Sequence, residues 1–113
     1  MADWELAVHA ARSKKAEDIV VLNIMEVSSF TDAFVICTGT NPRQAQSIAD
    51  AIETNLRAQG LRPIGLEGYD SGAWVLMDYS DFVVHIFSPE ARGFYNLERL
   101  WKNAPRIPVP EAA

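Results

Sequence analysis

The spacing of hydrophobic and polar residues predicts three helices. One begins at a cap formed by Asp3 and ends near Lys15, because apolar positions recur along it at helical intervals. A second begins at a cap formed by Thr40 or Asn41 and ends at Gly60. The apolar stripe of this second helix comprises Ala45, Ile48, Ala49, Ile52 and Leu56.

The third helix is expected near the C-terminal end. Ser88 and Pro89 form a start signal, and the helix should end near Lys102. The side chains expected to point inward are Phe94, Leu97, Leu100 and Trp101. The next residues contain too many prolines for a helix or a sheet, which predicts an extended tail. We therefore expect a single domain at residues 1–106 and a tail at residues 107–113.

Five strands are expected between these helices. Residues 18–24 are rich in β-branched side chains, and residues 33–39 form a continuous apolar run typical of a strand buried on both faces. Residues 61–68 predict a short edge strand, because Pro63 cannot donate a ladder hydrogen bond. Residues 72–87 predict a tight hairpin of two strands. The order is αββαβββα, and the fold class is α/β (α+β) with a mixed β-sheet flanked by helices.

Length and charge narrow the classes of function. The chain has 113 residues, the size of one domain, and its net charge of −5 argues against sequence-independent binding to nucleic acid. A basic protein partner fits this charge, although solubility alone also explains it. No apolar run approaches the roughly 20 residues of a membrane span, and the N-terminus lacks the features of a secretion signal. The single cysteine, Cys37, fits a reducing cytosol, so a cytoplasmic location is expected.

One catalytic hypothesis is nucleotidyl transfer. The tripeptide TGT at residues 38–40 lies between a strand and a helix, where a phosphate could bind, and Asp78 and Asp81 could hold magnesium. Two side chains share a strand face at a spacing of two, whereas these acids are three apart. We favour the interpretation that Asp78 and Asp81 form turns by bonding local backbone amides.

Acid–base, nucleophilic and metal chemistry are also weakly supported. Cys37 and His85 could form a dyad, but Cys37 lies in a run that is expected to be buried, where a thiol is inert. His85 alternates with apolar residues and is expected to be a hydrogen-bonded histidine of the sheet. Two histidines and one cysteine show no metal-ligand spacing, so neither a metal nor a cofactor is expected.

The hairpin suggests binding instead. Trp74, Leu76 and Asp78 share one face of a strand, while Val75, Met77 and Tyr79 take the other. If the face with Val75 is the core, the face with Trp74 is an open patch of the kind that binds partners. The alternative, that Trp74 packs under the last helix, remains open.

Three blocks of the sequence closely resemble the ribosomal silencing factor family, also called the Iojap-like family. These blocks are SSFTDAFVICTGTNPRQAQSIAD, EGYDSGAWVLMDYSDFVVHIF and FYNLERLW, and the resemblance covers about residues 15–106. The chain departs from the family at Ser80, where glycine is frequent, and at Ser88, where many members have a more polar or bulkier residue.

The resemblance implies a nucleotidyltransferase-like fold without the catalytic acids. It implies a translation repressor that binds the large ribosomal subunit at its protein number fourteen and sterically blocks joining of the small subunit when nutrients are short. In some lineages the family is linked to late large-subunit assembly, and free members are often homodimers. Carried onto this chain, the partner-binding strand comprises Trp74, Leu76 and Asp78, with Tyr79 and Asp81 as secondary candidates.

These arguments favour a ribosome-binding inhibitor that is not an enzyme. An acidic chain with an exposed tryptophan suits a basic ribosomal protein, and Asp78 would pair there with a lysine or arginine. Neither membrane association nor sequence-specific nucleic-acid binding is expected. The alternative is a degenerate or active nucleotidyltransferase that acts on nucleotide or RNA, and nucleotide binding would distinguish the two.

Overall fold

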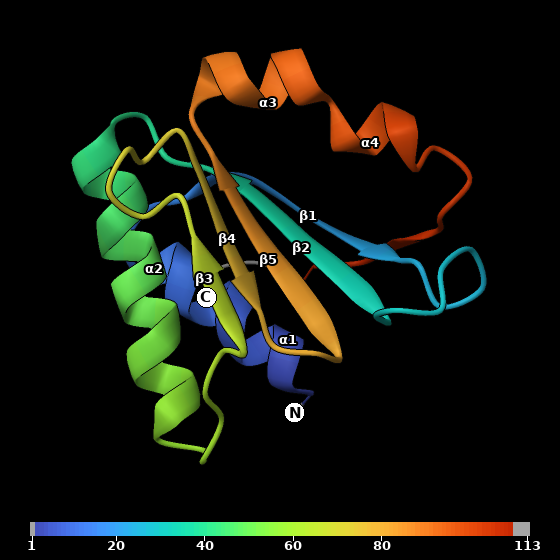
Figure 1. The fold of residues 1–113 in the computed structure, drawn as a ribbon, viewed down its shortest axis with the longest axis horizontal. Coiled ribbons are helices and arrows are strands. Elements are labelled where there is room, and N and C mark those ends of the chain that lie inside the picture. Colours follow the sequence, from blue (N-terminus) through green and yellow to red (C-terminus); the bar gives the residue numbers. More distant parts are fainter. Residues whose placement is uncertain (1, 110–113) are drawn as a thin grey trace.

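One mixed sheet organises the chain. The computed structural model describes residues 2–109. Its elements are α1 (Asp3–Ser13), β1 (Glu17–Asn23), β2 (Ala33–Thr38), α2 (Pro42–Arg57), β3 (Gly65–Glu67), β4 (Trp74–Asp78), β5 (Phe82–Phe87), α3 (Pro89–Tyr95), α4 (Leu97–Leu100) and β6 (Arg106–Ile107). The six strands lie in the order β3-β4-β5-β2-β1-β6 (Figure 1). Within this described part of the chain, none of the helices is both long enough and apolar enough to cross a bilayer.

The centre of the sheet is the parallel pair β2 and β5. Ala33 lies opposite Phe82 at one end and Thr38 opposite Phe87 at the other, and every residue of both strands is buried. The other strand pairs are antiparallel. Burial on both faces explains why these two strands are continuously apolar instead of alternating. The mixed sheet flanked by helices that the sequence predicts is confirmed.

Helices α1 and α2 pack on one face of the sheet (Figure 1). In α2 the Asn41 side chain accepts the backbone N–H of Gln44 at 2.8 Å, which confirms one of the two predicted caps. The buried residues of α2 are those of the predicted stripe, Ala45, Ile48, Ala49, Ile52 and Leu56. Because each large aliphatic side chain contributes roughly 1.5–3 kcal/mol when buried, this stripe fixes α2 on the sheet.

The cap of α1 differs from the prediction. Ala2, not Asp3, is the capping residue, and its backbone N–H donates to the Glu5 carboxylate at 3.0 Å. Asp3 is the first helical residue. An acid is favoured both at the cap and in the first turn, so the residue type alone does not separate the two positions.

The final predicted helix is broken in two. Asn96 adopts a left-handed conformation with φ 45° and ψ 61°, which ends α3 and begins α4. Of the four side chains expected to point inward, Leu97 is buried and Trp101 is half-buried. Phe94 and Leu100 are 81% and 71% exposed, so their inward placement was wrong. The break at Asn96 changes the direction of the chain, which disrupts the single stripe that a continuous helix would have.

The chain beyond α4 joins the sheet again. Arg106 and Ile107 form β6, and Ile107 pairs with Val21 of β1. The prediction that prolines exclude this segment from a sheet was wrong, because the two paired residues lie between Pro105 and Pro108 at an edge. Residues 110–113 of the predicted tail lie outside the described residues.

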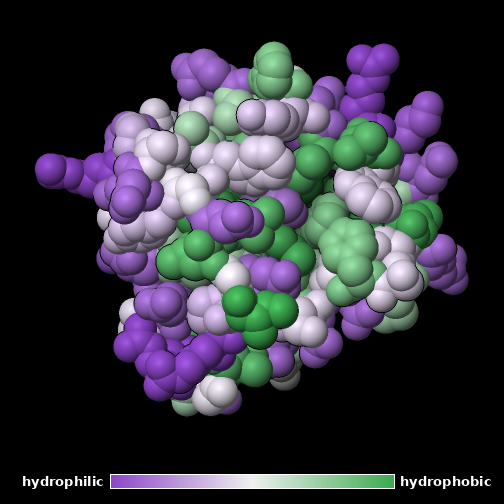
Figure 2. All heavy atoms as spheres, viewed as in Figure 1, coloured by the Kyte–Doolittle hydropathy of each residue, from purple (hydrophilic) through white to green (hydrophobic). Residues whose placement is uncertain are grey.

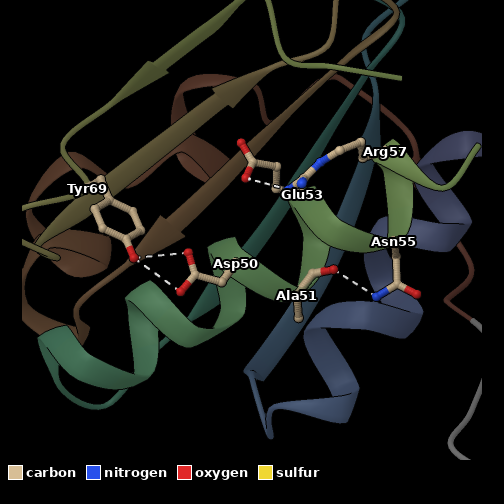
Figure 3. A network of polar contacts seen from close by, with 6 residues as sticks. All are labelled: Asp50, Ala51, Glu53, Asn55, Arg57 and Tyr69. Atoms are coloured by element: carbon tan, nitrogen blue, oxygen red, sulfur yellow. Dashed lines mark hydrogen bonds and ion pairs between the residues drawn. The ribbon is translucent and has the colours of Figure 1, made fainter. Parts of the chain in front are cut away.

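Polar contacts attach the connection between β3 and β4 to α2 (Figure 3). The Tyr69 hydroxyl donates to Asp50 at 2.9 Å, and the Gln46 side chain donates to the Tyr69 carbonyl at 3.0 Å. Gly68 has φ 77°, and a Cβ at this position would overlap the carbonyl oxygen of Trp74. The connection therefore fixes the point at which β4 begins.

Candidate functional site

Strand β4 presents two different faces. Val75 and Met77 are 0% and 1% exposed and pack on the side of α1 and α2. Trp74, Leu76 and Asp78 are partly buried on the opposite side, and we call these three residues the Trp74 face. The predicted alternation is confirmed, and the side with Val75 is the core. Figure 2 shows hydrophobic residues gathered across the centre and right of the view, below α3 and α4, with hydrophilic residues around them.

Trp74 is both packed and accessible. Its ring lies 4.9 Å from the Phe87 ring and 4.5 Å from the Tyr95 ring of α3, measured between centroids. Its indole N–H donates to Nδ1 of His85 at 3.1 Å. Trp74 therefore combines the two interpretations that the sequence left open: α3 holds one side of the ring, and part of the ring remains in solvent.

His85 and Cys37 form no catalytic pair. Ile36 is the residue of β2 that lies opposite His85, so His85 and Cys37 point to opposite faces of the sheet. Burial lowers the pKa of His85 to about 4 and raises the pKa of the Cys37 thiol to about 12. At neutral pH the histidine is therefore an uncharged hydrogen-bond acceptor, and the cysteine is an inert thiol. Both expectations about these residues are confirmed.

The two acids of the hairpin do not converge. One carboxylate oxygen of Asp78 accepts the Ser80 backbone N–H at 2.8 Å, which confirms the turn-forming role predicted for Asp78. Asp81 is exposed and lines a hollow of about 260 Å³, together with Asp3 and Asp32. Asp78 does not line this hollow. Among residues 2–109, no three His, Cys, Asp or Glu side chains are grouped so that they could hold a metal ion.

Tyr79 is not part of the Trp74 face. It is 7% exposed, belongs to the core on the side of α1 and α2, and stacks on Phe82 at a centroid distance of 5.1 Å. Of the five residues predicted to bind the partner, the structure thus brings Trp74, Leu76 and Asp78 together. It places Asp81 at the turn and Tyr79 in the interior.

The TGT loop is occupied by contacts within the chain. Thr38 accepts a hydrogen bond from Arg92 at 2.9 Å, and the Gly39 N–H donates to the Phe87 carbonyl at 2.9 Å. The Thr40 N–H donates to the Gln44 side chain at 2.6 Å. The bond from Arg92 therefore attaches α3 to β2, and the Gly39 and Thr40 amides are not free to bind a phosphate.

Two residues beside the Trp74 face were not predicted. Glu67 is exposed on β3 and lies directly opposite Leu76, which adds a second carboxylate near Asp78. Tyr95, the last residue of α3, is 49% exposed and packs against Trp74. The sequence carries a signal for this end, because Asn96 caps the following helix by accepting the Arg99 N–H at 3.3 Å.

Comparison with known proteins gives consistent results. A family model described as "Ribosomal silencing factor during starvation" matches residues 2–113. The chain is 44% identical over 103 residues to the ribosomal silencing factor RsfS of Halalkalibacterium halodurans, which covers 91% of this chain and 88% of the relative.

Two further relatives extend this result. A crystal structure of a Chromobacterium violaceum protein superposes with a TM-score of 0.86 at 32% identity, covering 98% of this chain and 92% of the other. A mouse protein named "Mitochondrial assembly of ribosomal large subunit protein 1" is 30% identical over 102 residues, which are 88% of this chain and 45% of the mouse protein. The resemblance found in the sequence is thereby confirmed.

Proposed function

This chain belongs to the ribosomal silencing factor family, and we propose that it represses translation by binding the large ribosomal subunit in the cytoplasm. The contact is with large-subunit protein number fourteen, and the bound protein sterically blocks joining of the small subunit when nutrients are limiting. Such a block requires a tight site and enough bulk to clash, with no turnover. The free protein is proposed to be a homodimer, as the family resemblance implies.

The observation that carries this proposal is the composition of the Trp74 face. A partly accessible tryptophan beside Leu76 supplies the aromatic and aliphatic anchor that interface hot spots favour. One oxygen of Asp78 is bonded to Ser80, which fixes the carboxylate while its other oxygen can accept from a lysine or arginine. Glu67 adds negative charge opposite Leu76. The face therefore suits a basic protein surface.

The name of the mouse relative supports the choice of subunit, because it refers to assembly of the ribosomal large subunit. The arrangement of polar groups supports a role without catalysis. Asp78 and Asp81 are separated, and the Gly39 and Thr40 amides of the TGT loop are already bonded within the chain. Binding by shape and charge accounts for the Trp74 face without a chemical step.

The test is to mix purified ribosomal subunits with the protein and to follow formation of joined ribosomes by sedimentation. We expect the protein to co-sediment with large subunits and to reduce joining. Trp74→Ala should weaken large-subunit binding by about 30-fold or more, the effect of losing a hot-spot tryptophan. Arg57→Ala, an exposed change on α2, serves as the matched control and should bind normally.

Two outcomes would contradict the proposal. Unchanged joining at saturating protein would exclude the block. A Trp74→Ala variant with a normal thermal melt and normal affinity would remove the Trp74 face from the interface. A melt that collapses would instead assign Trp74 to the core, where truncation costs roughly 3–5 kcal/mol of folding free energy.

A further inference from the structure

We infer that His85 is a positioning residue for Trp74, which holds the indole in the orientation that the Trp74 face presents to its partner. This inference rests on the proposed function, because it assigns a role within the same interface. His85 itself is 4% exposed, which is too little for a direct contact with a partner. Its effect on binding would therefore pass entirely through Trp74.

The strand register brings the two side chains together. On adjacent antiparallel strands, Phe87 lies opposite Trp74 and His85 lies opposite Leu76, so Trp74 and His85 are diagonal neighbours on one face. The distance from the indole Nε1 to Nδ1 of His85 is 3.1 Å. Because an indole has a single hydrogen-bond donor, this bond determines which edge of the ring faces the sheet.

Packing alone does not fix that orientation. The Phe87 and Tyr95 rings lie at 34° and 45° to the Trp74 ring, and they limit how far the indole can move. Aromatic pairs gain only about 0.5–1.5 kcal/mol beyond area burial from their preferred geometries, so these contacts select the ring orientation weakly. A directional hydrogen bond distinguishes between these orientations, and His85 provides it.

His85 is poorly suited to a purely structural role. Its Nδ1 accepts from Trp74, so the neutral ring carries its proton on Nε2. Nε2 is buried and has no hydrogen-bond partner among residues 2–109, which costs free energy. The edge-on contact with Phe34, at a centroid distance of 4.7 Å, would be equally available to a phenylalanine. The one favourable interaction that needs a histidine-like acceptor here is the bond to Trp74.

The first part of the test uses the free protein and two variants. His85→Phe keeps an aromatic ring and removes the acceptor, whereas His85→Asn retains an acceptor close to the position of Nδ1. The readout is the indole N–H signal of Trp74 in an NMR spectrum of ¹⁵N-labelled protein, assigned by its absence in Trp74→Phe. We expect this signal to shift and its hydrogen exchange to accelerate about 10-fold in His85→Phe, the equivalent of one lost hydrogen bond. In His85→Asn it should stay near the wild-type position. An unchanged signal in His85→Phe overturns the inference.

The second part measures affinity for large subunits. His85→Phe should bind about 10-fold more weakly with a melt equal to or above that of the wild type, and His85→Asn should recover much of the loss. In a Trp74→Phe background, His85→Phe should cause no further loss of affinity, because the indole that His85 orients is absent. Additive losses, or no recovery by His85→Asn, would show that His85 does not act through Trp74.

The outcomes separate this inference from the proposed function. If Trp74→Ala loses affinity and His85→Phe does not, the Trp74 face is the interface and the positioning role is wrong. If the wild-type protein does not bind large subunits, the proposed function fails and the role of His85 in binding fails with it. The NMR measurement still decides whether His85 orients Trp74.

Discussion

The folding stability of the protein should fall as the pH is lowered from about 6.5 to about 4, because His85 is buried in its neutral form. Burial lowers the pKa of His85 from 6.5 to about 4 in the folded protein. Between these values the unfolded chain binds a proton at this site and the folded chain does not, so acid favours unfolding. Neutral His85 therefore imposes no protonation penalty above about pH 6.5, and the penalty grows as the pH falls toward 4.

The size of the effect follows from the two pKa values. At about 1.36 kcal/mol for each pH unit, the full loss is about 3 kcal/mol, of which about 2 kcal/mol is lost by pH 5. A domain of this size is stabilised by about 5–15 kcal/mol, so this acid-induced loss would be a substantial fraction of the total. Replacing His85 with phenylalanine removes the titrating group and keeps an aromatic ring in its place.

The assay is urea unfolding of the wild type and His85→Phe at pH 7.5 and pH 5.0. Carboxylates and the exposed His9 are present in both proteins, so the difference between the two pH-dependent losses isolates His85. The wild type should lose about 2 kcal/mol more than the variant. Equal losses in wild type and His85→Phe would show that His85 binds its proton freely in the folded protein, and the reasoning from burial would be wrong.

Three other changes test separate parts of the structure. Asp78→Lys should weaken large-subunit binding more than Trp74→Ala does, because it places a positive charge against a basic partner, and should lower the free energy of unfolding by only about 1 kcal/mol through the lost bond to the Ser80 N–H; equal affinity for wild type and variant would exclude Asp78 from the interface. Gly68→Ala should lower the free energy of unfolding by about 2 kcal/mol or more, since the new Cβ would overlap the Trp74 carbonyl at a positive φ, and urea unfolding would measure it. Cys37 should resist a thiol reagent at pH 8 in the folded protein, because burial raises the pKa of its thiol to about 12, and it should react once urea unfolds the protein. Rapid reaction of the native thiol would disprove the burial of Cys37.

The elements that the sequence predicted best are those specified by local pattern. The stripe of α2, including Ile48 and Ile52, repeats at helical spacing between a capping Asn41 and a stop at Gly60, so residue type and position agree throughout. The strand β2 was predictable because a continuous apolar run of its length has few alternatives. Both features depend on residues that are close together in the sequence, so local pattern is sufficient to predict them.

The break in the last helix depends on a single residue that favours two states. Asn96 is tolerated within a helix, but it also adopts the left-handed conformation that ends one helix and caps the next. The left-handed conformation of Asn96 ends α3 so that Tyr95 packs against Trp74 and Phe94 lies in solvent. The sequence therefore predicted that Trp74, Leu76 and Asp78 share one strand face, but not that this face lies away from the core or how much of it the following helix covers.

The bond between Trp74 and His85 was beyond prediction for a different reason. The two residues are eleven positions apart, and whether they become neighbours depends on the register of β4 against β5. The tight turn at Ser80 sets this register, and Ser80 adopts φ 74°, a left-handed conformation that glycine adopts most readily. A one-residue change in the turn would move His85 to another position opposite β4, so the site is encoded jointly by the turn and by both strands.

The geometry of the Trp74 face supports its proposed role in binding, because its largest side chain is already held in the free protein. Association costs free energy when mobile side chains become ordered, and large rings that are already held lose less freedom. Trp74 is held before binding by Phe87, Tyr95 and the hydrogen bond to His85. On the opposite side of the molecule, α2 presents polar groups that bond to one another, such as Tyr69 with Asp50 (Figure 3). A partner would have to break those bonds to use that surface, whereas the Trp74 face offers an ordered ring and a fixed carboxylate that can bind at once.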